Sequence, residues 1–175
     1  MNEPSTTCLQ LGDPVLRCHA LPVDNVAEKA IQATVTLMQT VLTASQGVGI
    51  AAPQINVSKQ IIIVASRPNQ RYPNAPLMDP TVMFNPTFEA VGTELEKDWE
   101  GCLSVPSIRA LVPRFKTIQV RYINVLGDLE QMQLEGFVAR IFQHECDHLQ
   151  GKVFLDRVDA TVDIIAESEY LKLFN

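Results

Sequence analysis

The 175-residue chain has little that would link it to a membrane or to secretion. No apolar run approaches the length that spans a bilayer. The N-terminal stretch MNEPSTTCLQ has neither the basic nor the apolar region of a secretory signal, and it is not Arg-rich like a transit peptide. These absences predict a cytoplasmic protein with no membrane contact.

Paired cysteines and an excess of positive charge are also missing. The four cysteines form no CxxC pair, so free thiols are expected, with a pair of disulfides as the alternative. The net charge of −6 gives no sign of a nucleic-acid-binding surface, although it leaves room for a local basic patch. We therefore expect no direct binding to nucleic acid.

The composition itself is that of an ordinary globular protein. Hydrophobic residues make up 46% of the chain, and a chain of 175 residues can bury a proper core. The sequence contains no repeat, low-complexity segment or linker. It therefore predicts a single domain over residues 1–175.

Hydrophobic periodicity gives a coarse set of elements. Asp24 is placed to cap a helix that runs to about Gln46 and stops at Gly47. Four prolines mark residues 66–80 as a loop. Strands are expected at 60–65, 81–92 and 116–125, and from a hairpin turn at 127–128 to residue 134.

The stretch FQHECDHLQG, residues 142–151, carries two of the three histidines. On a helix, His144 and His148 lie on one face, one turn apart, so both imidazoles can bind one metal ion. Glu145 lies at the flank, placed for a hydrogen bond to a water, while Cys146 and Asp147 point away. The alternative is a surface helix with histidines there by chance.

The same helix is expected to be buried. From about Glu135 it carries Phe137, Ile141, His144 and His148 with helical spacing, which defines an inward face ending in the histidine pair. Together with the predicted strands this indicates an α+β fold. We expect mostly antiparallel strands wrapped around a central HExxH helix, plus an N-terminal helix.

A catalytic metal site needs a third protein ligand and one open position. Metalloproteases of the HExxHxxGxxH type take a third histidine from further along the chain. Here Gly151 matches the glycine, but Phe154 stands at the histidine position, and His19 lies in the N-terminal segment. A downstream carboxylate or one of the four cysteines remains as the candidate.

Two further stretches are too specific to be dismissed as loops. QGVGIAAPQ (46–54) places glycines, which let a backbone approach a ligand closely, before the amide of Gln54. A flexible connection is the alternative for this stretch. DWEGCLSVP (98–106) places Cys102 after a glycine, where a plain core cysteine is the alternative.

Taken together, GVGIAAPQ, EGCLS and QHECDH resemble, in order and spacing, the three signature motifs of peptide deformylases. The resemblance extends from LGDPVLR near the N-terminus to DRVD at 156–159. It implies a metal-dependent hydrolase that removes the N-formyl group from the formylmethionine of newly made polypeptides and releases formate.

The resemblance also implies roles for individual residues. The metal ligands would be Cys102, His144 and His148, with Glu145 as general base. The formyl oxygen would be met by the metal and by two further donors, the Gln54 side chain and the Leu103 main-chain N–H. The substrate peptide would be bound by Val48, Gly49, Glu100, Gly101 and Ile141.

In this pocket, Val48, Leu103 and Ile141 would form the apolar wall for the methionine side chain. The peptide backbone would pair as an added strand beside Gly49 and the EGC segment. Trp99 and Arg140 adjoin motif residues and could shape the pocket mouth, with a plain core position as the alternative for Trp99.

One divalent metal ion is the expected cofactor. The resemblance points to Fe²⁺, while a Cys/His/His set also suits zinc, nickel or cobalt. N-formylmethionyl peptides are the expected partners, with a transient encounter with nascent chains at the ribosome. The tail ATVDIIAESEYLKLFN is acidic, so docking on ribosomal RNA through it is unfavourable.

Two other functions fit parts of this pattern. A zinc protease that cleaves internal peptide bonds would need an extended cleft and a different third ligand. A non-catalytic domain with a structural metal site would need a fourth protein ligand.

Overall fold

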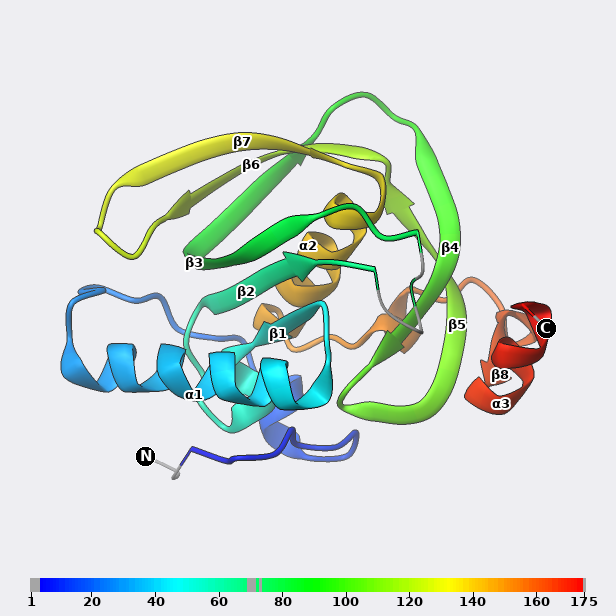
Figure 1. Cartoon of the computed structure of the whole chain (residues 1–175), viewed down its shortest axis with the longest axis horizontal. Coiled ribbons are helices and arrows are strands. Elements are labelled where there is room, and N and C mark those ends of the chain that lie inside the picture. Colours follow the sequence, from blue (N-terminus) through cyan, green and yellow to red (C-terminus); the bar gives the residue numbers. More distant parts are fainter. Residues whose placement is uncertain (1–3, 69–71, 73, 175) are drawn as a thin grey trace.

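The computed structural model describes residues 4–68, 72 and 74–174. Two antiparallel sheets and three α-helices account for most of this part of the chain (Figure 1). The larger sheet has the order β1 (Gly49–Ala51), β2 (Ile61–Ser66), β3 (Met78–Ala90), β6 (Thr117–Ile123) and β7 (Leu129–Glu135). The smaller has the order β4 (Leu95–Cys102), β5 (Val105–Phe115) and β8 (Ile164–Ala166).

The helices are α1 (Lys29–Ser45), α2 (Gly136–Leu149) and α3 (Glu167–Tyr170). Short 3-10 turns are found at Pro14–Arg17, Ala52–Ile55, Phe154–Arg157, Thr161–Asp163 and Leu171–Phe174. No described helix is long and apolar enough to cross a membrane.

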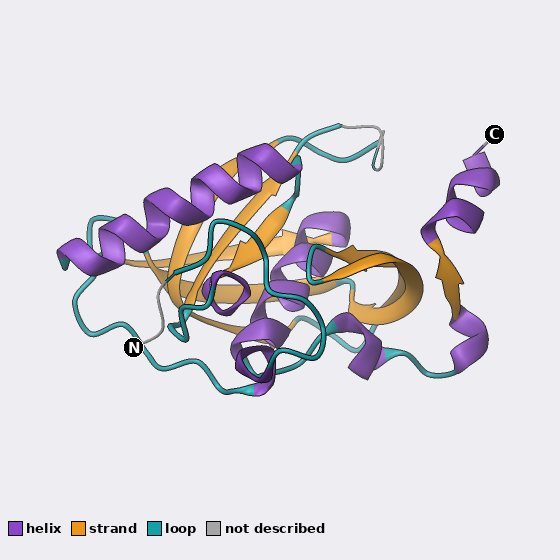
Figure 2. Cartoon of the chain, turned by 90° about the horizontal axis from the view of Figure 1, so that it is seen from below, coloured by secondary structure: helices purple, strands orange, loops and turns teal. Residues whose placement is uncertain are grey.

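Helix α2 lies in the middle of the molecule, with strands of both sheets around it (Figures 1 and 2). Every residue from 139 to 149 is buried. The predicted α+β fold, with antiparallel strands around a central HExxH helix, is confirmed, and the surface-helix alternative is excluded. Cys146 and Asp147 do point away from the two histidines, but they face protein and not solvent.

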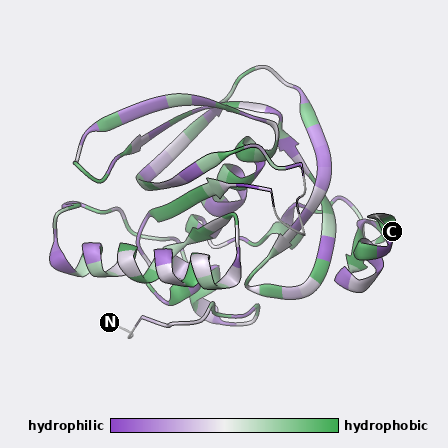
Figure 3. Cartoon of the chain, in the orientation of Figure 1, coloured by the Kyte–Doolittle hydropathy of each residue, from purple (hydrophilic) through white to green (hydrophobic). Residues whose placement is uncertain are grey.

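Strand β2 of the larger sheet is covered on both faces. Ile62 and Val64 pack in the cluster that includes α2, whereas Ile61 and Ile63 pack with α1. Alternate side chains of a strand point to opposite faces, so a strand between two helices must be apolar throughout. Figure 3 shows this continuous hydrophobic band in β2.

The N-terminal helix begins later than its sequence indicates. Glu28 and not Asp24 stands at the N-cap of α1. The Asn25 side chain accepts a hydrogen bond from the Ala27 N–H at 3.0 Å, an Asx turn that competes with helix before Lys29. The end agrees with expectation, because Gln46 adopts the left-handed conformation directly after Ser45.

The smaller sheet was not anticipated. Residues 95–102 and 105–115 form a long hairpin, and β8 of the C-terminal tail pairs with β5, with Ile108 opposite Ala166. β4 is largely exposed and charged over its first half, so it lacks the alternation that identifies a half-buried strand. β3 also starts at Met78, inside the segment predicted as loop.

Candidate metal and catalytic site

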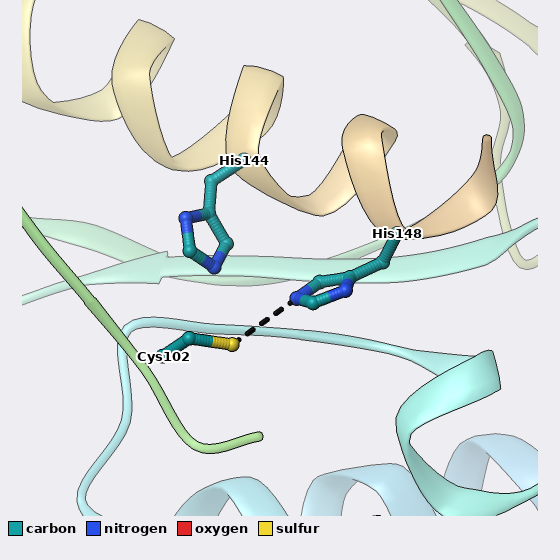
Figure 4. A group of neighbouring side chains, drawn as sticks. All are labelled: Cys102, His144 and His148. Carbon is teal, nitrogen blue, oxygen red and sulfur yellow. Dashed lines mark hydrogen bonds between the residues drawn. The ribbon is translucent and has the colours of Figure 1, made fainter. Parts of the chain in front are cut away.

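The end of β4 meets the inward face of α2 at a group of three side chains that could hold a metal ion. The ligand atoms of Cys102, His144 and His148 all lie within 4.8 Å of one another (Figure 4). The Cys102 Sγ is 3.2 Å from the His148 Nε2. Phe154, which occupies the position of a third histidine in other HExxH proteins, stacks on the His144 ring at 6.0 Å between centroids.

This donor set fits a single divalent transition-metal ion. A thiolate and two imidazoles are borderline-soft ligands of the kind that zinc and iron sites use. No fourth cysteine, histidine or carboxylate joins the group within the described residues. Three protein ligands leave a position for substrate or water, so a closed structural site finds no support in the described part of the chain.

Glu100 orients one of the two histidines. Its Oε2 lies 2.8 Å from the His144 Nδ1, which directs the Nε2 of that ring toward Cys102. Arg114 and Arg140 hold the Glu100 carboxylate with hydrogen bonds of 2.8–3.0 Å. Burial opposes the charge, but Arg114 and His144 hold the pKa of Glu100 well below its usual range. The carboxylate is thus turned inward, which leaves only the main chain of Glu100 for contact with a peptide.

The outer side of α2 is tied into the same network. Asp147 accepts a hydrogen bond of 2.6 Å from the Arg114 Nη1 and another of 2.6 Å from the Arg157 Nη2. Arg114 therefore bridges the carboxylates of Glu100 and Asp147. Sequence reasoning missed this arginine, because its partners lie 14 and 33 residues away.

The surroundings of Cys102 favour the ionised form of its thiol. Burial alone would raise its pKa, yet the neighbouring His148 and His144 lower the pKa well below the ordinary value. A thiolate is the form that binds a metal.

Glu145 is a buried carboxylate beside this group. Burial raises its pKa from 4.5 to about 7, and its Oε2 has no hydrogen-bond partner among the described residues. A Cβ built on Gly49 would lie 2.4 Å from the Glu145 Oε1. Glycine at this position thus lets strand β1 pass directly over the carboxylate.

Gln54 is held with its amide nitrogen toward the cysteine. Its Oε1 accepts a hydrogen bond from the Ala51 N–H at 2.8 Å. Its Nε2 lies 3.2 Å from the Ser104 Oγ and 3.6 Å from the Cys102 Sγ. The Gln54 side chain therefore presents an N–H donor to the space beside Cys102.

Known proteins share both the sequence and the fold. The sequence profile described as polypeptide deformylase matches residues 6–163. The chain is 48% identical to peptide deformylase 2 of Nostoc sp. over 173 residues, covering 99% of this chain and 97% of that protein. It is 42% identical to peptide deformylase 1 of Bordetella pertussis over 150 residues, 86% of this chain and 85% of that protein.

A crystal structure of a class I type b peptide deformylase from Acinetobacter baumannii, bound to Met-Ala-Ser, has a TM-score of 0.85 and 39% identity. The match covers 90% of this chain and 100% of the Acinetobacter baumannii chain. The chain belongs to the polypeptide deformylase family. It is accordingly a metal-dependent hydrolase that deformylates N-formylmethionine peptides.

The pocket opens next to the three candidate metal ligands and has a volume of about 590 Å³ including its solvent-open part. The sequence-predicted residues along its lining are Val48, Gly49, Gln54, Trp99, Glu100, Gly101, Cys102, Leu103, Arg140, Ile141, His144 and Glu145. His148 lies deeper, beneath the lining.

Two aromatic residues of the lining were missed as site residues. Tyr72 and Phe137 pack with ring centroids 4.8 Å apart at the edge of the pocket. Phe137 was recognised only as part of the inward face of its helix. Tyr72 lies in the proline-rich loop, where an aromatic residue is the one signal that could have drawn attention to it.

Proposed function

We propose that Cys102, His144 and His148 hold one ferrous ion and that Glu145 acts as the general base of deformylation. The observation that carries this proposal is the buried Glu145 carboxylate beside three convergent side chains. Its Oε2 has no hydrogen-bond partner among the described residues, and burial raises its pKa to about 7. A base with a pKa close to the working pH transfers protons most effectively.

A bound divalent ion supplies a Lewis acid and lowers the pKa of water near it. Glu145 accepts the proton of the attacking water as the water oxygen adds to the formyl carbon. The carbon–nitrogen bond then breaks, and Glu145 returns the proton to the departing nitrogen. Formate and a free amino terminus are the products.

Two donors of the chain stabilise the charge that develops on the formyl oxygen. The Nε2 of Gln54 is directed at the site by the bond of its Oε1 to Ala51. The main-chain N–H of Leu103, one residue after Cys102, supplies the second donor. Loss of one such donor typically costs about 3–4 kcal/mol of transition-state stabilisation.

Two strand edges bracket the pocket and suit a bound peptide. β1, which contains Gly49, is an edge strand of the larger sheet, and β4, which ends at Cys102, is an edge strand of the smaller one. An extended peptide can add to such an edge through main-chain hydrogen bonds. Val48 and Ile141 then line the apolar space for the methionine side chain.

Cytoplasmic nascent chains are the substrates that we propose. A transient encounter with nascent chains at the ribosome does not require a segment of this chain that binds nucleic acid. The acidic C-terminal tail is packed on β5 through β8, so it does not form a basic extension that would be attracted to RNA.

The test of the catalytic role is Glu145→Gln, assayed by formate release from formyl-Met-Ala-Ser. We expect one metal ion per chain to remain while kcat falls by several orders of magnitude. Near-normal formate release with the metal still bound would refute the role.

The test of the metal is one batch of apo-protein loaded with iron, nickel or zinc. The iron form should be fast but lose activity in air, because oxygen oxidises ferrous iron and the Cys102 thiolate. The nickel form should keep its activity in air, and the redox-inert zinc form should be stable but slow. Equal rates and equal air stability would refute the choice of iron.

A further inference from the structure

Arg109 is a third buried arginine, separate from Arg114 and Arg140, which hold Glu100. Its side chain is 2% exposed and comes from β5. Its Nε and Nη2 donate to the Glu167 Oε1 at 3.2 and 2.6 Å, and its Nη1 donates to the Tyr72 hydroxyl at 2.8 Å. Glu167 is the first residue of α3, so an ion pair anchors the C-terminal segment against the body of the molecule.

Two aromatic contacts extend this anchor to the pocket. The Tyr170 ring lies 5.1 Å from the Arg109 Cζ and 5.6 Å from the ring of Trp99. On the other side, Tyr72 packs on Phe137. Trp99, Tyr72 and Phe137 all line the pocket, whereas Tyr170 does not.

The main chain of β4 rests directly on the same arginine. A Cβ built on Gly101 would lie 2.7 Å from the Arg109 guanidinium, closer than any side chain tolerates. Gly101 stands one residue before the ligand Cys102 and is part of the edge to which a peptide would add. The guanidinium therefore supports this edge of the pocket from behind.

We propose that Glu167 and Tyr170 are positioning residues for substrate binding, which act through Arg109 on Trp99 and on the Gly101 edge. This inference rests on the proposed function of the pocket. The tail 164–170 is then the outer support of the peptide-binding wall, with no contact to the metal ligands among those described. Figures 1 and 2 show this segment on the outer side of the β4–β5 hairpin, away from α2.

The variant that tests the ion pair is Glu167→Gln in the full chain, with Glu169→Gln as the matched control. Glu169 lies on the same short helix but pairs with the exposed Lys172. Because the Arg109 hydrogen bonds to residue 167 lose their charged acceptor, we expect Glu167→Gln to raise KM for formyl-Met-Ala-Ser about tenfold. The value of kcat should stay within about twofold, since binding and not the chemical step is affected.

A second readout does not depend on activity. Trp99 is the only tryptophan of the chain, so acrylamide quenching of its fluorescence reports on this wall alone. Quenching should increase in Glu167→Gln and in Tyr170→Leu, while Tyr170→Phe, which keeps the ring, should behave like the unaltered protein. Glu169→Gln should leave both KM and quenching unchanged.

The proposal is overturned if Glu167→Gln matches Glu169→Gln in KM and in quenching. It is also overturned if kcat falls together with metal content, because the ion pair would then support the metal ligand Cys102 and not the peptide wall. Absence of formate release from the unaltered, metal-loaded protein would instead refute the proposed function, and the quenching comparison would still test the anchor.

Discussion

Glu145→Gln should make the stability of the metal-free fold less sensitive to rising pH while it removes catalysis. The Glu145 carboxylate is buried, and its Oε2 has no partner among the described residues. Burial raises its pKa from 4.5 to about 7, so the folded state holds this proton more tightly than the unfolded state does. Glutamine has nearly the same shape but carries no charge to desolvate.

The sign and size of this effect on folding stability follow from proton linkage. Between pH 4.5 and about 7 the folded state binds more protons, so the stability of the unaltered protein falls as pH rises through this window. The pKa difference corresponds to a loss of about 3 kcal/mol of folding stability once the pH is well above 7. The glutamine amide lacks partners of its own, which costs about 1–3 kcal/mol at every pH.

The measurable quantity is therefore the change with pH and not the absolute difference. Urea unfolding of the chelator-treated proteins at pH 5 and pH 8 should show the variant gaining about 2–3 kcal/mol relative to the unaltered chain between these two values. Glu169→Gln, on the exposed face of α3, should show no such gain. A difference between Glu145→Gln and the unaltered chain that stays constant with pH, or reverses, would refute the reasoning.

Three other outcomes are expected. Arg114→Met should destabilise the fold by about 3 kcal/mol, because it removes one cationic partner from each of two buried carboxylates, Glu100 and Asp147. The exposed Arg121→Met should cost less than about 1 kcal/mol; similar urea midpoints would contradict this. Burial opposes the Asp147 charge, but Arg157 and Arg114 lower the pKa of Asp147. The contribution of this carboxylate to folding stability is therefore complete above its unfolded pKa of 3.8 and is lost as pH falls. Circular dichroism from pH 5 to 2 should show a shallower acid decline in Arg114→Met. Cys102→Ser should abolish the sulfur-to-metal absorption of the cobalt-loaded protein, and Cys18→Ser should keep it.

Cys146 shows that helical spacing alone does not predict the solvent exposure of a residue. Helical spacing correctly directs it away from the two histidines, which suggests a replaceable outer position. The helix is central, however, and Cys146 is buried among residues of the larger sheet. Direction around a helix is a local property, but what a face contacts depends on the rest of the chain.

Features that depend on short spacings along the chain can be predicted without the fold. The four-residue interval places His144 and His148 on one side of α2, and the run of apolar residues at 61–65 specifies a strand covered on both faces. The order of the three motifs was enough to identify the family, because such motifs are read without knowledge of the fold.

Tertiary structure alone decided which distant groups support the site. Arg114 joins Glu100 to Asp147, and Arg109 joins the C-terminal Glu167 to the pocket loop, in pairs 14 to 58 residues apart. Such partners meet only after the β4–β5 hairpin has closed around α2. Hydrophobic periodicity does not predict this closure, because β4 is exposed over its charged half and becomes buried only toward Cys102.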